Sequence, residues 1–118
     1  MMRRLGDEHQ AIRIDPEGEV TYHKPGNGKN FSLAELQSLV GGMIERVSLP
    51  SQQEYLFCDE NGLLKDLPGN FPIERKMRDY LTELKEKDSV PWFHLLHYVT
   101  SFPALVGPVV IVPKGMVL

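Results

Sequence analysis

Apolar and polar residues alternate in the first part of the chain in the way that is typical of β-strands. Residues 11–14 carry this pattern, and residues 19–23 repeat it after a turn that contains Pro16 and Gly18. Pro16 fixes φ at the second turn position, and Gly18 tolerates a positive φ. The pattern therefore predicts a β-hairpin over residues 11–23.

Further strands are predicted in the middle of the chain. Residues 43–49 and 54–59 are short runs rich in apolar residues, each bounded by turn-forming residues. Asn61-Gly62 follows the second run, and this dipeptide strongly favours a two-residue hairpin turn. Residues 63–67 are therefore expected to return as a strand.

A capping-box motif predicts a helix over residues 33–40. Ser32 supplies the cap hydroxyl and Glu35 follows three residues later, so that each side chain can accept a hydrogen bond from a backbone amide near the other. Gly41 and Gly42 come directly after the apolar positions. They end the helix, because a left-handed residue at this point is least strained as glycine.

A longer helix is predicted over residues 72–86. Its apolar positions recur at helical spacing, and they are Ile73, Met77, Tyr80, Leu81 and Leu84. The opposite face mixes acidic and basic residues, which indicates a solvated surface. Asn70 precedes the helix and either caps it or lies at a pocket. Pro91 can start a short third helix in the aromatic segment 91–102.

Residues 109–112 form a continuous β-branched run, which is typical of an interior strand covered on both faces. The elements follow one another in the order ββ-α-βββ-α-(α)-β. This order predicts a single α+β domain over residues 1–118 with one mostly antiparallel sheet. Within that domain, residues 1–9 are expected to be a flexible N-terminus and residues 85–102 an elaborated aromatic segment.

The composition disfavours several classes of protein. The chain has 118 residues, 42% of them apolar and 25% charged, with a net charge of −3, so an ordered globular domain is expected. The 13 basic residues are dispersed among 16 acidic ones, whereas nucleic-acid binders usually carry a basic stripe. No apolar run is long enough to span a membrane, and polar residues follow Arg3-Arg4 where a signal peptide has its apolar core. We therefore expect a cytoplasmic protein with no membrane contact.

Three segments together resemble a family of small domains of unknown function found in bacteria, their phages and mobile elements. The segments are Leu36-x-x-Leu39-Val40-Gly41-Gly42-x-Ile44-Glu45-x-Val47, Asp59-Glu60-Asn61-Gly62-Leu63-Leu64-Lys65-x-Leu67-Pro68-x-Asn70 and Val106-Gly107-Pro108-Val109-Val110. The opening Ile14-Asp15-Pro16-Glu17-Gly18 is also similar to that family's first hairpin. The resemblance implies a fold and a phage or mobile-element context, and it implies no catalytic residues.

Four polar residues are candidates for binding a small ligand, namely Glu45, Arg46, Lys65 and Asn70. Glu45 interrupts an apolar row of its strand. It is either a ligand-facing carboxylate beside the glycine turn or a rim residue paired with an arginine or with backbone amides. The four groups would form one site if the glycine turn and the hairpin after it converge.

No cofactor and no metal ion are expected. His94 and His97 would share a helical face, but zinc requires three or four ligands. Cys58 is the only cysteine and lies in an apolar strand, so it is expected to be a small core residue. No local signature supports a catalytic thiol.

Aromatic residues are dense just after the long polar helix. Trp92, Phe93 and Phe102 either pack into the core or form an interface. The apolar residues of this segment wrap around most of a helix, so they cannot all face one core. We expect at least one of these three side chains to be exposed in an isolated chain and buried in a dimer or complex.

The sequence favours a non-enzymatic accessory binding protein of bacterial, phage or mobile-element origin that acts through protein–protein interaction. The expected partner is another protein or a second copy of the chain. The alternative is a protein that binds or sequesters a small nucleotide-like ligand. A hydrolase would need paired carboxylates or a metal site, and no motif supports one.

Overall fold

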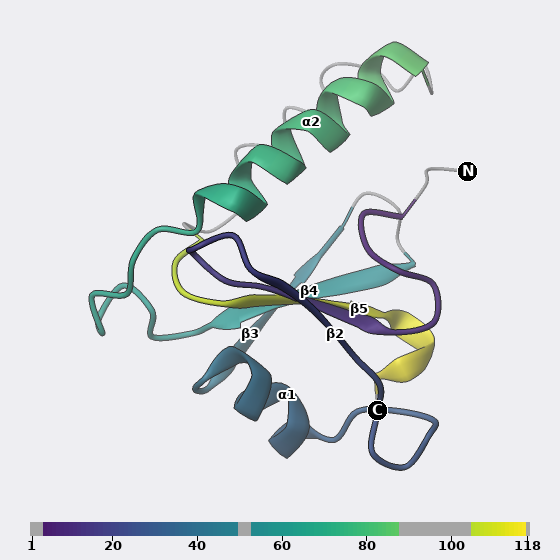
Figure 1. Cartoon of the computed structure of the whole chain (residues 1–118), viewed down its shortest axis with the longest axis vertical. Coiled ribbons are helices and arrows are strands. Elements are labelled where there is room, and N and C mark those ends of the chain that lie inside the picture. Colours follow the sequence, from purple (N-terminus) through teal and green to yellow (C-terminus); the bar gives the residue numbers. More distant parts are fainter. Residues whose placement is uncertain (1–3, 50–52, 88–104, 118) are drawn as a thin grey trace.

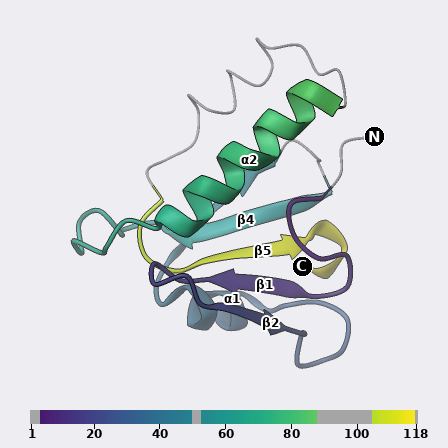
Figure 2. The same cartoon turned by 45° about the horizontal axis from the view of Figure 1, so that its top comes forward.

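The structure is a computed structural model that describes residues 4–49, 53–87 and 105–117. One five-stranded antiparallel sheet has the order β2-β1-β5-β4-β3, and a helix lies on each of its faces (Figures 1 and 2). The elements are β1 (Ala11–Ile14), β2 (Val20–His23), α1 (Leu33–Val40), β3 (Ile44–Ser48), β4 (Glu54–Asp59), α2 (Phe71–Lys87), β5 (Val109–Pro113) and the short 3-10 helix η1 (Lys114–Met116). This arrangement confirms the predicted α+β domain with an antiparallel sheet.

The strand predicted at residues 63–67 is absent from the structure, which corrects the expected hairpin. The segment forms helical turns instead, because its amides bond to carbonyls only a few residues earlier. The Lys65 amide donates to the Asn61 carbonyl and the Leu67 amide to the Gly62 carbonyl. The third helix predicted within residues 91–102 lies outside the described residues.

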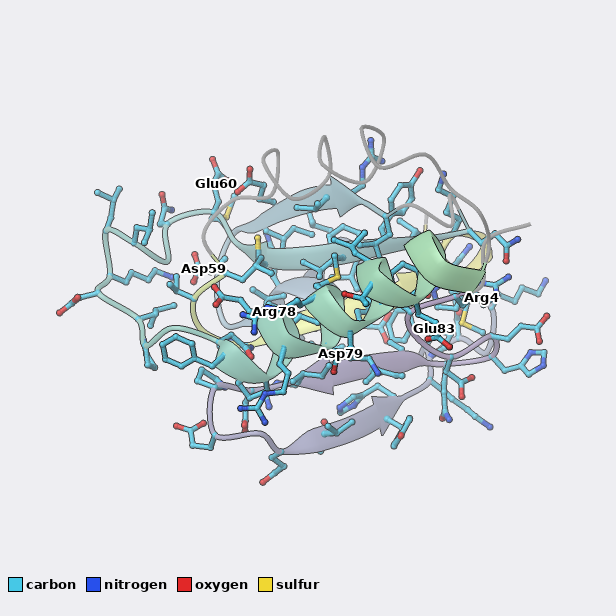
Figure 3. All side chains as sticks on the ribbon, turned by 90° about the horizontal axis from the view of Figure 1, so that it is seen from above. Arg4, Asp59, Glu60, Arg78, Asp79 and Glu83 are labelled. Carbon is cyan, nitrogen blue, oxygen red and sulfur yellow. The ribbon has the colours of Figure 1, made fainter. Side chains whose placement is uncertain are left out.

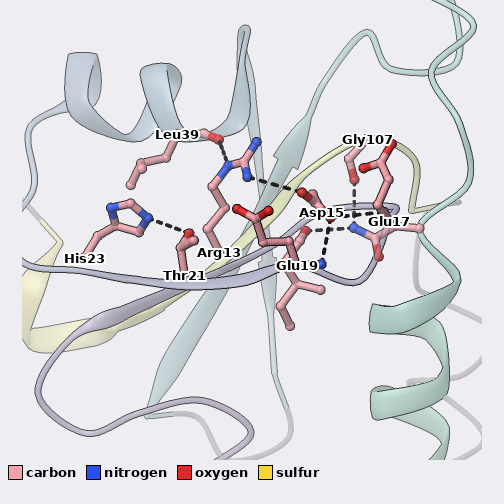
Figure 4. A network of polar contacts seen from close by, with 10 residues as sticks. Arg13, Asp15, Glu17, Glu19, Thr21, His23, Leu39 and Gly107 are labelled. Atoms are coloured by element: carbon pink, nitrogen blue, oxygen red, sulfur yellow. Dashed lines mark hydrogen bonds and ion pairs between the residues drawn. The ribbon is translucent and has the colours of Figure 1, made fainter.

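The hairpin over residues 11–23 is confirmed, and its turn is held by Asp15 (Figure 4). The Asp15 carboxylate accepts hydrogen bonds from the Glu17 and Glu19 amides at 3.0 and 2.9 Å. Gly18 has a φ of +93°, as expected for a glycine at this position of the turn. Arg13 of β1 donates from Nε to the Leu39 carbonyl, which ties the hairpin to α1.

Helix α1 begins with the predicted capping box. The Glu35 amide donates to the Ser32 hydroxyl at 3.1 Å, and the Ser32 amide donates to the Glu35 carboxylate at 2.9 Å. The helix ends at Gly41, which has a φ of +93° and bonds back to the Gln37 carbonyl. Leu36 and Val40 are its buried residues, and they pack on the sheet.

Replacement of Ser32 by alanine is expected to lower the free energy of unfolding by about 1 kcal/mol, because the Glu35 amide loses its acceptor. Urea denaturation measures this difference. Ser38→Ala serves as the control, because Ser38 is an exposed residue within the same helix. An equal loss in both variants would contradict the capping role.

Strand β5 is the centre of the sheet, as predicted from its β-branched run. Its four residues from Val109 to Val112 are fully buried. Val109 and Ile111 pack in the cluster under α2, whereas Val110 and Val112 pack in the cluster under α1. The sheet therefore has an apolar core on each face.

Helix α2 covers the face of the sheet opposite α1. Ile73, Met77, Tyr80 and Leu81 of the predicted stripe are buried against that face, while Arg78 and Asp79 point away from it (Figure 3). The Leu84 side chain lies outside the described residues. Neither helix in the described part of the chain is long and apolar enough to cross a membrane.

Part of the segment expected to be a flexible N-terminus is attached to the sheet. Leu5 is buried, and the Leu5 and Gly6 amides both donate to the carboxylate of Glu54 at the start of β4. The Glu54 side chain is itself fully buried. Arg4 adds a hydrogen bond from its guanidinium to the Gln53 carbonyl at 3.1 Å.

Candidate interaction site

The segment 60–70, which joins β4 to α2, projects from one end of the sheet (Figures 1 and 2). We call it the β4–α2 loop. Two other parts of the chain contact it, namely the turn between α1 and β3 and residues 105–107 before β5. These are the three segments that carry the family resemblance, and they meet in one place.

An ion pair between a buried aspartate and a partly exposed lysine holds the start of the loop. Lys65 Nζ lies 2.8 Å from Asp59 Oδ2, and the Asn61 amide donates to Asp59 Oδ1 at 2.8 Å. The Asp59 side chain is 1% exposed and that of Lys65 is 42% exposed. Asp59 and Glu60 mark the point at which the loop leaves the sheet in Figure 3.

The contact with Lys65 favours the ionised form of the Asp59 carboxyl. Burial alone would raise the pKa of the Asp59 carboxyl, but the hydrogen bond and charge of Lys65 and the Asn61 amide outweigh burial and hold the pKa below its usual value. The pair therefore contributes its stability at neutral pH. That contribution is lost only as the pH falls below the ordinary pKa of an aspartate and through the lowered one.

Gly42 lets the ion pair pack against the turn between α1 and β3. An added Cβ at residue 42 would lie 2.5 Å from Lys65 Nζ and 2.7 Å from Asp59 Oδ2, so any side chain there would force the ion pair to shift. The two glycines after α1 thus have different roles. Gly41 ends the helix with a positive φ, and Gly42 makes room for the loop.

Residues 105–107 hold the other side of the loop. The Gly107 amide donates to the Pro68 carbonyl and the Asn70 amide donates to the Leu105 carbonyl, both at 2.8 Å. An added Cβ at Gly62 would lie 2.5 Å from Val106 Cγ2. The loop is therefore fixed at both ends by backbone hydrogen bonds and close packing.

Asn70 is fully buried at the end of the loop and confirms the predicted helix cap. Its Oδ1 accepts from the Ile73 amide at 3.1 Å. Its Nδ2 donates to the Ile14 carbonyl at 2.9 Å and to the Gly107 carbonyl at 2.8 Å. The side chain thus joins α2, β1 and the segment before β5.

The loop and the first residue of α2 expose three large apolar side chains. Leu63 is 69% exposed, Leu64 is 88% exposed, and Phe71, at the first position of α2, is 71% exposed. The Phe71 ring packs over Gly69, where an added Cβ would lie 3.4 Å from the ring edge. Sequence reasoning missed this surface because it placed Leu63 and Leu64 in a strand.

The structure does not bring the four predicted ligand residues into one cavity. Lys65 and Asn70 belong to the β4–α2 loop, where both are engaged by other parts of the protein. Glu45 and Arg46 are exposed neighbours on edge strand β3, so their side chains lie on opposite faces of the sheet. Arg46 lies 4.6 Å from the centre of the Tyr55 ring, where it makes a cation–π contact.

A family of domains of unknown function matches residues 9–115, a range that includes every strand of the sheet and both helices. The chain belongs to the DUF3846 family. The resemblance to a small domain of unknown function is thereby confirmed. No curated protein and no solved structure matches the chain.

The single cysteine of the DUF3846 domain is a core residue, as predicted. Cys58 is 3% exposed and packs in the cluster under α2. Burial, followed by the nearby Glu45 and Asp59 carboxylates, raises the pKa of its thiol to about 11, so it remains protonated at neutral pH. A nucleophilic role is therefore disfavoured.

An open depression of about 380 Å³ lies between the end of β2 and α1 in the DUF3846 domain. Its lining residues are His23, Lys24, Phe31, Ala34, Glu35, Ser38 and Leu39. None of the four predicted ligand residues lines it. The part of the chain that the structure describes holds no group of three metal-ligating side chains. Trp92, Phe93, His94, His97 and Phe102 lie outside the described residues.

Proposed function

We propose that this DUF3846 domain is a non-enzymatic accessory binding protein that acts by docking its β4–α2 loop on another protein. The observation that carries the proposal is the exposure of Leu63 and Leu64 on a loop that is fixed at both ends. The resemblance of the segments that build this loop to bacterial, phage and mobile-element domains supports an origin of that kind.

The rigidity of the loop favours binding. A loop that is already ordered loses little conformational entropy when it docks, so more of the contact energy remains as affinity. Leu63 and Leu64 are adjacent and exposed to water, and their burial under a partner would lower the free energy of the complex. The Asp59–Lys65 ion pair and the contacts of Gly62 with Val106 provide this order before any partner arrives.

The charges around the leucines indicate the chemistry of the partner. Glu60 and Asp66 are exposed acidic residues of the loop, and Asp66 adopts a φ of +55°. The charge of Lys65 is already matched by Asp59. The exposed loop is therefore acidic around an apolar tip, which favours a partner with an apolar pocket and a basic rim.

The small-ligand alternative rests on the depression between β2 and α1. His23 and Lys24 line it, and both side chains can donate hydrogen bonds to an anionic ligand. Glu35 also lines it, and this carboxylate is held by the Ser32 and Gly26 amides. A carboxylate in the wall disfavours a phosphate, so we rank this alternative second.

The loop proposal is tested by crosslinking and then by affinity. A photoreactive amino acid at position 64 should crosslink one bacterial or phage protein, which is identified, purified and titrated against the wild-type chain. Leu63→Ser/Leu64→Ser should weaken this binding at least about tenfold, because burial of a leucine is worth about 1.5–3 kcal/mol. Binding that survives the double variant would contradict the proposal.

Leu33→Ser is the matched control for this experiment. Leu33 is 60% exposed, but it lies at the start of α1 and not in the β4–α2 loop. Its affinity for the partner should equal that of the wild-type chain. A thermal-shift screen with nucleotides tests the alternative, since a site-specific ligand raises the melting temperature.

A further inference from the structure

Strand β2 is an outer strand of the sheet (Figure 2), and the hydrogen bonds of the hairpin show which of its backbone groups point outward. The Asp15 amide donates to the Glu19 carbonyl opposite it, so this is a hydrogen-bonded pair of the hairpin. Such pairs alternate along an antiparallel ladder. Thr21 and His23 therefore bond to β1, while the N–H and C=O groups of Val20 and Tyr22 point away from the sheet.

The same two residues carry exposed apolar side chains. Val20 is 45% exposed and Tyr22 is 57% exposed. They lie opposite Ile14 and Ile12 of β1. These side chains share the face of the sheet that α2 covers over the inner strands. An edge with unpaired backbone groups and an apolar face is a template for a further strand.

We propose that β2 pairs in antiparallel fashion with β2 of a second copy of the chain, with Thr21 opposite Thr21 on the two-fold axis. Residues that face each other across such an axis must lie on the same face of the joined sheet. Among the registers that meet this condition, this one alone pairs Val20 with Tyr22 on both sides of the axis. It therefore satisfies all the outward groups of these two residues in both copies.

The side chains of β2 are complementary to themselves in this register. Val20 meets Tyr22 of the second copy, which is a favourable β-branched and aromatic pair, and Thr21 meets Thr21. Glu19 faces His23, so a carboxylate, which accepts hydrogen bonds, lies opposite an imidazole, which can donate one, at each end of the joined strands. This complementarity favours a second copy over an unrelated extended segment, and it goes beyond the proposed docking of the β4–α2 loop.

A cysteine scan of the full chain tests both the pairing and its register. Thr21 would form a non-hydrogen-bonded pair with its copy, in which the Cα atoms are about 4.5 Å apart. This distance lies within the range that a disulfide spans. Thr21→Cys should therefore form a disulfide-linked dimer under mild oxidation at least about tenfold faster than an exposed cysteine elsewhere.

Leu33→Cys is that exposed control, since Leu33 is 60% exposed on α1. The native Cys58 is buried with a raised pKa, so the wild-type chain should remain unlinked. Equal rates for Thr21→Cys and Leu33→Cys would overturn the pairing. Faster linkage of Tyr22→Cys than of Thr21→Cys would overturn the register.

Sedimentation provides a second readout that needs no cysteine. The wild-type chain should sediment as a dimer, and Tyr22→Arg should sediment as a monomer with an unchanged circular dichroism spectrum. Leu64→Arg should stay dimeric, because Leu64 lies in the β4–α2 loop and not on β2. A monomeric wild-type chain whose loop still binds its partner would overturn the β2 pairing alone.

Discussion

Replacement of Asn70 by alanine is expected to lower the free energy of unfolding by about 4 kcal/mol, because several buried groups lose their partners at once. The Ile14 and Gly107 carbonyls would each lose a donor, and the Ile73 amide would lose its cap. Asn70 is fully buried, so in the wild-type chain these groups depend on its side chain and not on solvent. Urea denaturation of the two proteins measures the difference.

Asn70→Asp separates the cap from the two donated hydrogen bonds. Aspartate keeps the volume and the cap acceptor, but it removes both donors and places a carboxylate against two carbonyl oxygens. We expect a loss at neutral pH at least as large as that of Asn70→Ala. The deficit relative to the wild-type chain should shrink as the pH falls, because a protonated carboxyl can donate again. A stable Asn70→Asp variant at neutral pH would show that the two donated bonds contribute little.

Glu54→Leu is expected to have the second largest effect, a loss of about 3 kcal/mol. Leucine has a similar volume but no acceptor, so the buried Leu5 amide and the partly buried Gly6 amide would both lose their partner. The residues before β1 should then detach from the sheet. Hydrogen exchange at these two amides, measured together with urea denaturation, reports both effects.

Glu74→Leu is the matched control for Glu54→Leu, because Glu74 is an exposed glutamate on α2. It should change the stability by less than about 0.5 kcal/mol. Glu54→Gln should fall between the control and Glu54→Leu, since its amide oxygen can still accept from one of the two amides. Slow exchange at Leu5 and Gly6 in the leucine variant would contradict the role of Glu54.

Sequence patterns predicted the parts of the fold that depend on interactions between residues close together in the chain. The capping box at Ser32 and Glu35 and the Asp15 turn depend on residues close together in the sequence, and both are confirmed. The position of β5 at the centre of the sheet was also predictable. An unbroken β-branched run such as residues 109–112 is typical of a strand covered on both faces, and these residues are fully buried.

Specific contacts in three dimensions, most of them between distant residues, decided what local sequence patterns could not predict. The dipeptide Asn61-Gly62 favours a hairpin, but the ion pair of Asp59 with Lys65 and the packing of Gly62 on Val106 stabilise helical turns instead. The contact of Glu54 with the Leu5 and Gly6 amides likewise joins segments far apart in the chain. No local sequence pattern predicts such a contact.

The candidate site was partly predictable. Lys65 and Asn70 do lie in one loop, but their polar atoms serve the protein's own structure. Glu45 and Arg46 could have been separated from the sequence alone, because adjacent residues of a strand point to opposite faces. The exposed Leu63 and Leu64 followed only from the three-dimensional shape of the loop.

The central position of β5 also has a consequence for the order of events on the ribosome. The β1–β2 and β3–β4 hairpins are synthesised well before β5, and β5 is the strand that joins them, with Ile12 paired to Ile111. Until β5 emerges, each hairpin exposes an unpaired inner edge and an uncovered apolar face. A nascent chain stalled before this point therefore offers two aggregation-prone surfaces, and chaperones that hold unfolded chains would act in that interval.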